Sequence, residues 1–496
     1  MKGTTEPMLT KPRSTRTNMI VALVVTIAVA IVGYTLFISR ALGPFAALEP
    51  ENGSASTPAT VGLDPNASGG KYLQFGAGGP TVPPPPPATG AYWSDYYKRW
   101  PKGLNANGDP NFYPIGVWQQ TASRLYNGKT DAQNYSDIGI NFNIADVNWP
   151  GDQPAYDAVG WKHLPGGDGM ADVTNANKSA NNVGYMIDDE ADMNVWNDPA
   201  SFSADAMTRR SNLFRGSYKL DAGGKIIIDS MTKLAQHNND GIDASRPTYA
   251  NYGKPMVAPD GFIGYRYQNT YEADMKTYCD AVDLVSGDYY GYTDPNSPGP
   301  QQGGWTYGGV IDNLREHCGP NKPLWGFVDT NHSFTNNDNG FITADQMEIA
   351  TWNMVVHGAN GIIYFAHHFN GAGLVDEDGM LHYPDIAARA AQINAKLKSL
   401  APILNSYTNS NVDVSATSTN NIPVTTMYKV YNNSNYVFAM ADGNSTHIDS
   451  GATTGTISVP VTTGTATVMD ENRTVQIVNG KIVDNFSAYQ RHIYKF

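Results

Sequence analysis

The chain has 496 residues, enough for two or three domains, one of them as large as a barrel. Its formal net charge of −13 argues against nucleic acid as a partner, because no cluster of lysine and arginine outside the N-terminus could neutralise phosphates. The 29 tyrosines and 9 tryptophans suit carbohydrate stacking, but they are equally typical of extracellular proteins.

The N-terminus carries the clearest signal in the chain. Residues 19–38 are an uncharged apolar run of bilayer-spanning length. Basic residues precede this run, and acidic residues outnumber basic ones after it, so the positive-inside rule places residues 1–18 in the cytoplasm and the rest outside. We expect an uncleaved single-pass membrane anchor. Cleavage after Ala41 or Ala46 would instead give a secreted form.

Residues 39–90 read as a linker rich in Gly, Pro and Ser, which ends in a polyproline spacer at residues 83–87. Within it, residues 48–53 (LEPENG) and 66–75 (NASGGKYLQF) resemble the opening strands of β-sandwich carbohydrate-binding modules. The rest of such a sandwich is missing. We therefore interpret this partial module-like segment as linker or vestige.

Residues 91–402 alternate short apolar runs with helical stretches, as in βα repeats. The predicted helices include residues 225–238, 309–317, 343–356 and 386–400, the last stopped by Pro402. The third strand is not identifiable, because residues 164–182 are rich in Gly, Asn and Asp. The other seven strands are predicted at residues 112–117, 139–146, 183–187, 246–251, 282–289, 323–328 and 361–365. This rhythm indicates an α/β fold, a (β/α)8 TIM barrel.

Residues 403–496 have a different composition, dominated by Thr, Val, Ser and Asn. Short alternating runs separated by Gly and Asn predict a small C-terminal antiparallel β-sandwich, with strands at residues 426–430, 436–440, 456–460, 465–469 and 490–496. The two cysteines, Cys279 and Cys318, flank one predicted strand and its helix. A disulfide between them and two free thiols are equally compatible with the sequence.

Four acidic residues cluster where the fourth predicted strand ends: Asp188, Asp189, Glu190 and Asp192. Neighbouring carboxylates raise one another's pKa, so a stable fold tolerates such a cluster mainly at helix caps, metal sites or active sites. In parallel β/α folds the chemistry sits at the carboxyl ends of the strands. The cluster therefore suggests a catalytic acid or base, with an acidic helix N-terminus near Asp192 as the structural alternative.

Other predicted strand ends also carry polar or aromatic residues that a barrel core would not favour: Trp118, Gln119, Asp146, Trp149, Asp288, Tyr289, Tyr290, Asp329, His332, His367 and His368. Two carboxylates facing each other across a groove lined by aromatics are what cleavage of a glycosidic bond requires. For several of these residues a structural role is the alternative. Asp329 would then cap the following segment, and the histidines and tyrosines would pack at the barrel rim.

Motifs for other chemistry are missing. The sequence has no Gly-x-Ser-x-Gly elbow, phosphate loop or His-Glu-x-x-His motif. Residues 376–379 look like a fragment of a calcium loop without its remaining ligands, so a solvated acidic loop is the favoured interpretation. We expect neither a metal nor a cofactor.

The segments DDEADMN and PLWGFVDTNHS at the ends of strands four and seven resemble the clan A glycoside hydrolases, TIM barrels that often carry a C-terminal β-domain. The resemblance implies that Glu190 is the acid/base, preceded by Asp189 where that clan has Asn. Asp329 stands where the clan has a nucleophilic Glu. This shorter side chain leaves both a retaining and an inverting mechanism open.

These observations lead to one main hypothesis, a membrane-anchored extracellular glycoside hydrolase. Its partners would be a carbohydrate substrate and the membrane. Asp189 would tune Glu190, and the surrounding polar and aromatic residues would bind the sugar. The alternatives are a non-catalytic surface protein that binds glycans on the same barrel, and an adhesive or structural protein.

Overall fold

The computed structural model describes residues 59–63, 71–75, 92–146, 151–166, 177–190, 192, 219–220, 226–227, 243–258, 275–276, 278–280, 282–294, 303–331, 333, 341–370, 373–407, 414–444 and 450–496. The chain divides into two units, Met1–Thr81 and Val82–Phe496. In the first unit, β1 (Ala59–Leu63) pairs antiparallel with β2 (Lys71–Phe75), the end of the module-like segment. The expected anchor at residues 19–38 lies outside the described residues. Within the described part, no helix is both long and apolar enough to cross a bilayer.

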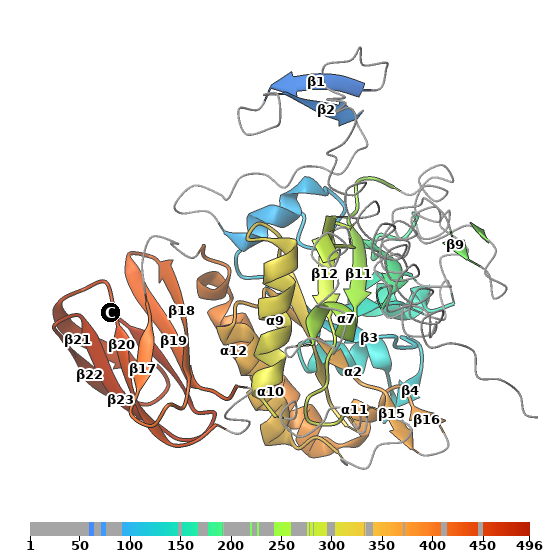
Figure 1. Cartoon of the computed structure of the whole chain (residues 1–496). Helices are drawn as coiled ribbons and strands as arrows, with labels where there is room; N and C mark the ends of the chain where they lie inside the picture. The colour runs from blue at the N-terminus through green and yellow to red at the C-terminus, as the bar shows by residue number, and fades with distance from the viewer. Residues whose placement is uncertain are drawn as a thin grey trace, which may run out of the picture. The chain divides into compact units, whose positions relative to one another are not determined.

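The second unit is built on an eight-stranded parallel sheet, as predicted (Figure 1). Backbone bridges between His163 and Asn182 and between Gly166 and Met186 join the two edges of the sheet, so it closes into a barrel. In chain order the strands are β3 (Ile115–Trp118), β6 (Phe142–Ile144), β7 (Lys162–Leu164), β8 (Tyr185–Asp189), β11 (Thr248–Tyr252), β12 (Leu284–Gly287), β13 (Leu324–Asp329) and β14 (Gly361–Phe365).

The third strand, β7, is present, although the sequence does not identify it. It spans Lys162–Leu164, just before the Gly/Asn/Asp-rich stretch. Its residues Lys162, His163 and Leu164 form no apolar run, so hydrophobic periodicity cannot reveal it. The strand is specified instead by its neighbours, because it pairs in parallel with β6 and is bridged to the chain leading into β8.

Side chains of the barrel strands alternate between two buried layers, as the period of two requires. On β13, Trp325 and Phe327 pack inside the barrel with Phe142, Tyr249 and Ile363. Leu324 and Val328 point the other way, into the core between sheet and helices. Both faces of this strand are buried, which explains its nearly continuous apolar sequence.

Helices cover the outside of the barrel: α2 (Asp131–Asp137), α3 (Gln153–Val159), α7 (Lys254–Val257), α9 (Trp305–Cys318), α10 (Ala344–Val356), α11 (Gly379–His382) and α12 (Pro384–Leu404). Two expectations were wrong here. Pro402 lies inside α12 because it falls in the last turn, where the N–H of Asn405 still bonds to the carbonyls of Ala401 and Ile403. In the predicted helix 225–238, the β-branched pair Ile226–Ile227 instead forms β10, opposite β9 (Lys219–Leu220).

A short 3-10 helix, η3 (Trp93–Arg99), closes the amino-terminal end of the barrel. Its Tyr97 is buried in the interior cluster and accepts a hydrogen bond from the indole of Trp325, near the start of β13. The hydroxyl of Tyr96 donates to the carbonyl of Asp283, just before β12. With this end filled by aromatic side chains, only the opposite end, where the strands finish, is left for chemistry.

The C-terminal part is antiparallel, as predicted. Its eight strands form one sheet whose outermost strands, β17 and β18, also contact each other, so the sheet folds back around its own core. Three strands were not predicted: β17, β22 and β23. The strands are β17 (Ala416–Ser418), β18 (Val424–Tyr431), β19 (Ser434–Ala441), β20 (Thr453–Ser458), β21 (Thr463–Val468), β22 (Arg473–Val478), β23 (Lys481–Phe486) and β24 (Arg491–Lys495).

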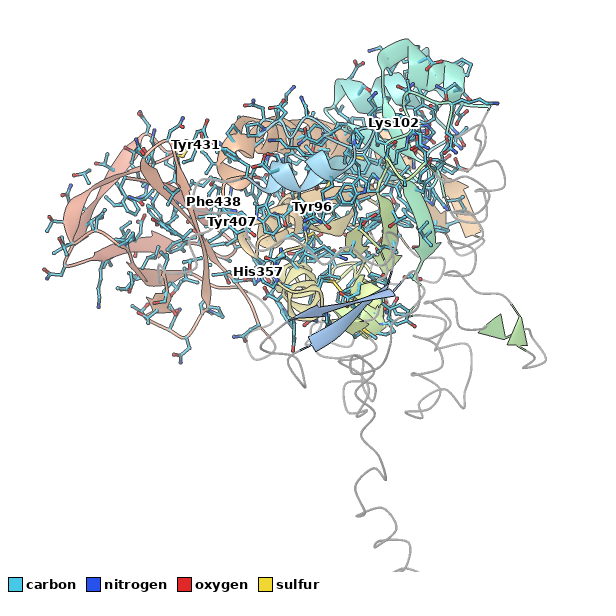
Figure 2. The ribbon with its side chains drawn as sticks, turned by 90° about the horizontal axis from the view of Figure 1, so that it is seen from above. Tyr96, Lys102, His357, Tyr407, Tyr431 and Phe438 are labelled. Carbon is cyan, nitrogen blue, oxygen red and sulfur yellow. A yellow bond between two sulfur atoms is a disulfide. The ribbon has the colours of Figure 1, made fainter. Side chains whose placement is uncertain are left out.

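One face of the β-domain packs into the hydrophobic cluster formed by the outer helices of the barrel. Phe438 on β19 belongs to the same buried cluster as the apolar faces of α10 and α12, and Figure 2 shows it on the side of the β-domain that faces the barrel. Beside it, the buried ammonium of Lys429 donates to the carbonyl of Ser406 after α12, at 2.9 Å. The two parts therefore form one folding unit.

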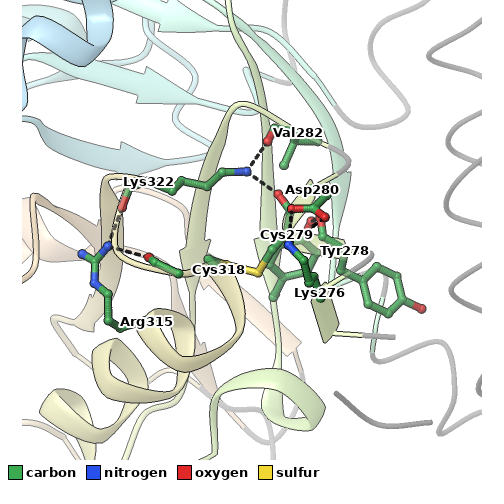
Figure 3. The surroundings of a disulfide bond; sticks show 10 residues. Lys276, Tyr278, Cys279, Asp280, Val282, Arg315, Cys318 and Lys322 are labelled. Carbon is green, nitrogen blue, oxygen red and sulfur yellow. Dashed lines mark hydrogen bonds and ion pairs between the residues drawn. A yellow bond between two sulfur atoms is a disulfide. The ribbon is translucent and has the colours of Figure 1, made fainter. Parts of the chain in front are cut away.

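Cys279 and Cys318 form a disulfide, which joins the segment before β12 to the end of α9 (Figure 3). The buried ammonium of Lys322 donates hydrogen bonds to the carbonyls of Cys279 and Val282 next to this bond. Burial lowers the pKa of Lys322 to about 8. The disulfide and the lysine together fix the start of β12, which carries Asp288 at its far end.

Candidate active site

Four carboxyl groups gather at the ends of three barrel strands. Asp189 is the last residue of β8 and Glu190 follows it; Asp288 comes directly after β12, and Asp329 is the last residue of β13. Asp189 is exposed, Glu190 and Asp288 are partly buried, and Asp329 is fully buried. The side chain of Asp188 lies outside the described residues. The structure thus brings the carboxylates of three predicted strand ends to one end of the barrel.

Asn251, at the end of β11, aligns the carboxylates on either side of it. Its amide donates to Asp189 at 3.1 Å and its side-chain oxygen accepts from Ser286 on β12 at 2.8 Å. The backbone carbonyl of Asn251 also accepts from the N–H of Glu190 at 2.9 Å. A shift in the β8–β11 register before Ala250 places Asp189 opposite Asn251. Sequence reasoning missed Asn251 and Ser286, although Asn251 ends the fifth predicted strand.

Glu190 and Asp288 form a hydrogen-bonded acid pair. Burial raises the pKa of Asp288 well above its usual range, and the negative charges of Glu190 and Asp189 raise it further. Burial also raises the pKa of Glu190, while the hydrogen bond from Asp288 and the charge of Lys254 oppose this rise. The arrangement that fits both shifts is a protonated Asp288 that donates to Glu190. Glu190 has a φ of 48°, a strained left-handed conformation for a residue other than glycine.

Asp329 is fixed by two neutral donors. The hydroxyls of Thr293 and Tyr307 donate to its two oxygens at 2.5 and 2.6 Å. Burial raises the pKa of Asp329 to about 6, although both hydrogen bonds oppose the rise. These contacts differ from the alternative role of Asp329 as a cap of the following segment, because both partners are side chains of other segments. Thr293 and Tyr307 carry no signal that would single them out in the sequence.

Tyr290 connects the four carboxyl groups electrostatically. Its pKa is raised well above the usual range, first by burial and then by the charges of Asp288, Asp329, Glu190 and Asp189. Its ring lies in the interior cluster of the barrel, 5.3 Å from the ring of Phe365. Tyr289 points the other way, into the outer core, with the ammonium of Lys254 5.8 Å from its ring centroid. Of the two predicted sugar-binding tyrosines, only Tyr290 therefore faces the carboxylates.

The structure places the remaining predicted binding residues at different depths. Trp118 is 5% exposed and packs edge-on against Phe327, so it forms part of the barrel interior. Gln119, half-buried with a φ of 49°, accepts a hydrogen bond from His367 on its carbonyl at 3.3 Å. His368 is partly exposed and bonds to the hydroxyl of Tyr383 at 2.8 Å. His367 is buried, and burial lowers its pKa.

Asp146 is buried at the end of the second strand, away from solvent. The nearest ring nitrogen of His163 lies 3.9 Å from its carboxylate, and burial lowers the pKa of His163 to about 3, so the imidazole is neutral. Trp149 and His332 lie outside the described residues. Asp192 has a structural role of another kind, because it accepts from the N–H groups of Gly253 and Met256 at the start of α7. The chain that follows Asp192, where a helix was the structural alternative, lies outside the described residues.

Comparisons with known proteins give similarity of fold. No model of a protein family matches the chain, and no curated protein matches its sequence. Among solved structures, a mutant of Gan42B, a GH42 β-galactosidase from G. stearothermophilus, matches with a TM-score of 0.44 at 8% identity, over 78% of this chain and 98% of that one. A glycoside hydrolase family 5 protein from Bacteroides vulgatus gives 0.42 at 11%, over 77% and 88%. AmyP in complex with maltotriose gives 0.40 at 9%, over 78% and 97%.

The described residues form an eight-stranded parallel barrel, the architecture predicted from the sequence. What the chain does follows from its own residues, since at such low identity a shared fold hosts many activities.

Proposed function

We propose that the protein is an O-glycosyl hydrolase that acts on a poly- or oligosaccharide with two carboxyl groups. The observation that carries this proposal is the set of four carboxyl groups around Tyr290 at the carboxyl ends of β8, β12 and β13. Glycosidic cleavage needs one protonated carboxyl group for the leaving oxygen and one ionised carboxylate for the anomeric carbon or its attacking water. The four groups differ enough in burial and hydrogen bonding to divide these tasks.

Glu190 suits the role of general acid. It follows β8 directly, is partly open to solvent, and has a pKa raised by burial. A raised pKa is the direction that a general acid requires, because such a group must hold a proton before it passes it to the leaving oxygen. Asp189, held by Asn251, adds a negative charge close to the pair. Its role is to tune the acid rather than to react.

Asp329 is the proposed second carboxylate. With a pKa of about 6 it is ionised at neutral pH, and the hydroxyls of Thr293 and Tyr307 hold it in a single orientation. Its complete burial means that the sugar would have to reach it from the side of Tyr290. Asp288 is the alternative for this task, because it lies closer to solvent and bonds directly to Glu190. Asp288 would need to lose its proton first.

The proposed location is the cell surface, with a single-pass anchor at residues 19–38 and the barrel outside, or a secreted form after cleavage. The apolar run with its preceding positive charges supports the anchor. The disulfide between Cys279 and Cys318 supports an oxidising compartment, since such bonds persist outside the cytosol.

A second function, glycan binding without catalysis, is favoured by one observation. Asp329 is 0% exposed, and both of its oxygens are already occupied by hydroxyl donors. A carboxylate sealed in this way can stabilise the fold without ever touching a sugar. On this alternative, the half-buried residues Gln119 and Glu190 would contact a bound glycan that is never cleaved.

Hydrolysis of aryl glycosides and polysaccharides by the purified chain tests the proposal. Glu190→Gln should lower the rate by about 100-fold or more on substrates with poor leaving groups. The loss should be much smaller on a dinitrophenyl glycoside, whose leaving group needs no proton. Asp329→Asn should lower the rate on both kinds of substrate. If Asp329→Asn retains activity and Asp288→Asn loses it, the second carboxylate is Asp288; binding without hydrolysis by the unmodified chain would favour the glycan-binding function.

A further inference from the structure

A second cluster of charged side chains lies in the loops that follow β3 and β14. The loop after β3 forms the hairpin of β4 (Leu125–Tyr126) and β5 (Lys129–Thr130); the loop after β14 forms β15 (His368–Asn370), β16 (Gly373–Asp376) and α11. Figure 1 shows β4, β15, β16 and α11 gathered at one end of the barrel. Both loops follow strand ends, so they belong to the same face as the strand-end carboxylates.

Three side chains in this cluster have the spacing of metal ligands. One ligand atom each from Asp376, Asp378 and His382 lies within 4.8 Å of the other two. The imidazole of His382 is 3.3 Å from each of the two carboxylates. Asp378 is almost fully buried, with 4% of its side chain exposed, whereas Asp376 and His382 are about one third exposed. An ion bound by these atoms would have one buried ligand, Asp378, and would still be accessible to solvent.

Asp131 is an independent acidic group beside this cluster, unpartnered within the described residues. This residue is fully buried, and neither of its carboxylate oxygens has a hydrogen-bond partner in the described part of the chain. Of all charged groups, Asp378 acts on it most strongly, followed by Arg124 and Glu377. A buried carboxylate without partners is costly. The charged group with the strongest effect on Asp131 is Asp378, the most buried carboxylate of the cluster.

Acidic groups outnumber basic ones in this cluster. The loop carries three acidic residues in a row, Asp376, Glu377 and Asp378. The guanidinium of Arg124 bonds to Glu377 and, at 3.0 Å, to Asp378, and the imidazole of His382 faces Asp376 and Asp378. A divalent ion at the cluster would add positive charge where the carboxylates converge.

The cluster is also rigidly built. The side chain of Gln120 donates to the carbonyl of Glu377 at 2.9 Å, and the hydroxyl of Thr121 donates to its carboxylate at 2.9 Å. The ring of Tyr126 lies against the imidazole of His382, with 4.5 Å between centroids. These contacts orient the ligands before any ion arrives, as metal sites with high affinity require.

A pocket of about 430 Å³ opens beside the cluster. The three charged ligands form one part of its lining. The apolar side chains of Leu125, Leu374 and Val375, which are 72%, 47% and 46% exposed, form another. An ion at the cluster would therefore have free coordination positions toward a hollow that a larger molecule can enter.

We propose that Asp376, Asp378 and His382 bind a divalent zinc-type transition-metal ion at this face of the barrel. The ligand chemistry selects the class of ion. Calcium and magnesium prefer sites made of oxygen alone, whereas one imidazole with two carboxylates and an open position suits Zn²⁺. The site is proposed in place of the solvated acidic loop expected from residues 376–379, whose sequence alone lacks the third ligand, His382 of α11. It is independent of the proposed glycosidase activity.

His357 provides an internal comparison. It too lies between two carboxylates, Asp312 and Asp442, at 2.8 and 2.9 Å. As with His382, each carboxylate faces a different ring nitrogen, but these groups do not form a metal-spaced cluster in the described part of the chain. A histidine between two acids is thus available as a matched control that should not bind the ion.

Calorimetric titration of the full-length chain with Zn²⁺, after removal of bound metal by EDTA and desalting, tests the proposal. We expect saturable binding that is weakened at least about tenfold by His382→Gln and is unchanged by His357→Gln. Asp376→Asn, which keeps the shape of the loop, should weaken it in the same way if His382→Gln does not fold. Failure of the unmodified chain to bind Zn²⁺, or an affinity in the His382 and Asp376 variants equal to that of the unmodified chain, would overturn the site. Tighter binding of Ca²⁺ than of Zn²⁺ would overturn the assignment of the ion.

Discussion

The imidazole of His357, at the carboxyl end of α10, bonds to Asp442 of the β-domain through Nε2 at 2.9 Å and to Asp312 of α9 through Nδ1 at 2.8 Å. The same Asp442 accepts from Asn353 on α10 and from Thr425 on β18. One carboxylate thus connects the barrel with the β-domain, and the charge on His357 decides the strength of the connection. Figure 2 shows His357 on the side of the barrel next to the β-domain.

The stability of the chain should depend on the protonation of His357. Its two carboxylate partners raise the pKa of His357 from 6.5 to about 10, although burial opposes the rise. Because the pKa is higher in the folded state, this contribution to stability is complete below about pH 6.5 and is lost as the pH rises through about 10. Chemical unfolding from pH 6 to pH 10.5 should therefore show a decreasing free energy of unfolding.

The variant His357→Gln should remove this dependence. We expect it to lower the free energy of unfolding near pH 7 by about 2 kcal/mol, since a hydrogen-bonded charge is lost at a partly buried site. The difference between the two proteins should shrink toward pH 10.5. A constant difference across this range would mean that another group causes the pH dependence.

The proposed nucleophile gives a prediction about the acidic side of the activity profile. Asp329 must be ionised to act, so activity should fall as the pH drops below about 6. The hydroxyl of Tyr307 lowers the pKa of Asp329, and Tyr307→Phe should therefore move this acidic limb to higher pH. The measurement is kcat/KM against pH on one aryl glycoside. Tyr364→Phe, which removes a buried hydroxyl bonded to Asn394, is the control and should leave the limb in place.

An acidic limb that is the same in Tyr307→Phe and in the unmodified chain would contradict the role of Asp329. The variant should also lose about 1 kcal/mol of stability, because one hydrogen bond to a carboxylate is removed. Since Tyr364→Phe loses a comparable bond, the stability effect alone cannot explain a shift seen only in Tyr307→Phe.

The fold was largely predictable because the apolar runs of its strands alternate clearly with helical stretches. Apolar runs such as residues 361–365 coincide with β14, and the run at 323–328 overlaps β13, because both faces of these strands are buried. The three-residue strand β7 has no such run. In strands β22 and β23 most residues are partly or fully exposed, so few buried positions mark these strands. The places where sequence reasoning failed are therefore short or solvent-facing elements, whose formation depends on their neighbours.

The candidate site was predictable only in part. The sequence places Glu190, Asp288 and Asp329 at strand ends, and alternation along the sixth strand explains why Tyr290 faces the interior while Tyr289 does not. The hydrogen bond between Glu190 and Asp288 joins residues from different strands, and it depends on a register that no local pattern encodes. The register shift that brings Asp189 opposite Asn251 is likewise a property of the paired strands.

The acid pair gives a prediction for the alkaline side of the profile. The hydrogen bond from Asp288 lowers the pKa of Glu190, so its loss in Asp288→Ala should raise that pKa and move the alkaline limb to higher pH. Asp288→Asn is the matched control, because its amide can still donate to Glu190. If both variants shift the limb equally, the hydrogen bond is not the cause, because only Asp288→Asn keeps a donor to Glu190. If both abolish activity on every leaving group, Asp288 itself takes part in the reaction.

The disulfide should stabilise the chain chiefly by restricting its unfolded state. Cys279 and Cys318 are separated by 39 residues, and closing a loop of this size should contribute about 4 kcal/mol. The double variant Cys279→Ala/Cys318→Ala should therefore unfold at lower denaturant concentration. Lys322→Met is the companion variant, because it removes the ammonium that bonds to the carbonyls of Cys279 and Val282 but leaves the covalent bond. Since the disulfide acts on the unfolded chain, adding a reductant should destabilise the unmodified chain and Lys322→Met alike. The double variant should be unchanged by the reductant. A reductant effect that persists in the double variant would show that the loss of stability has another origin.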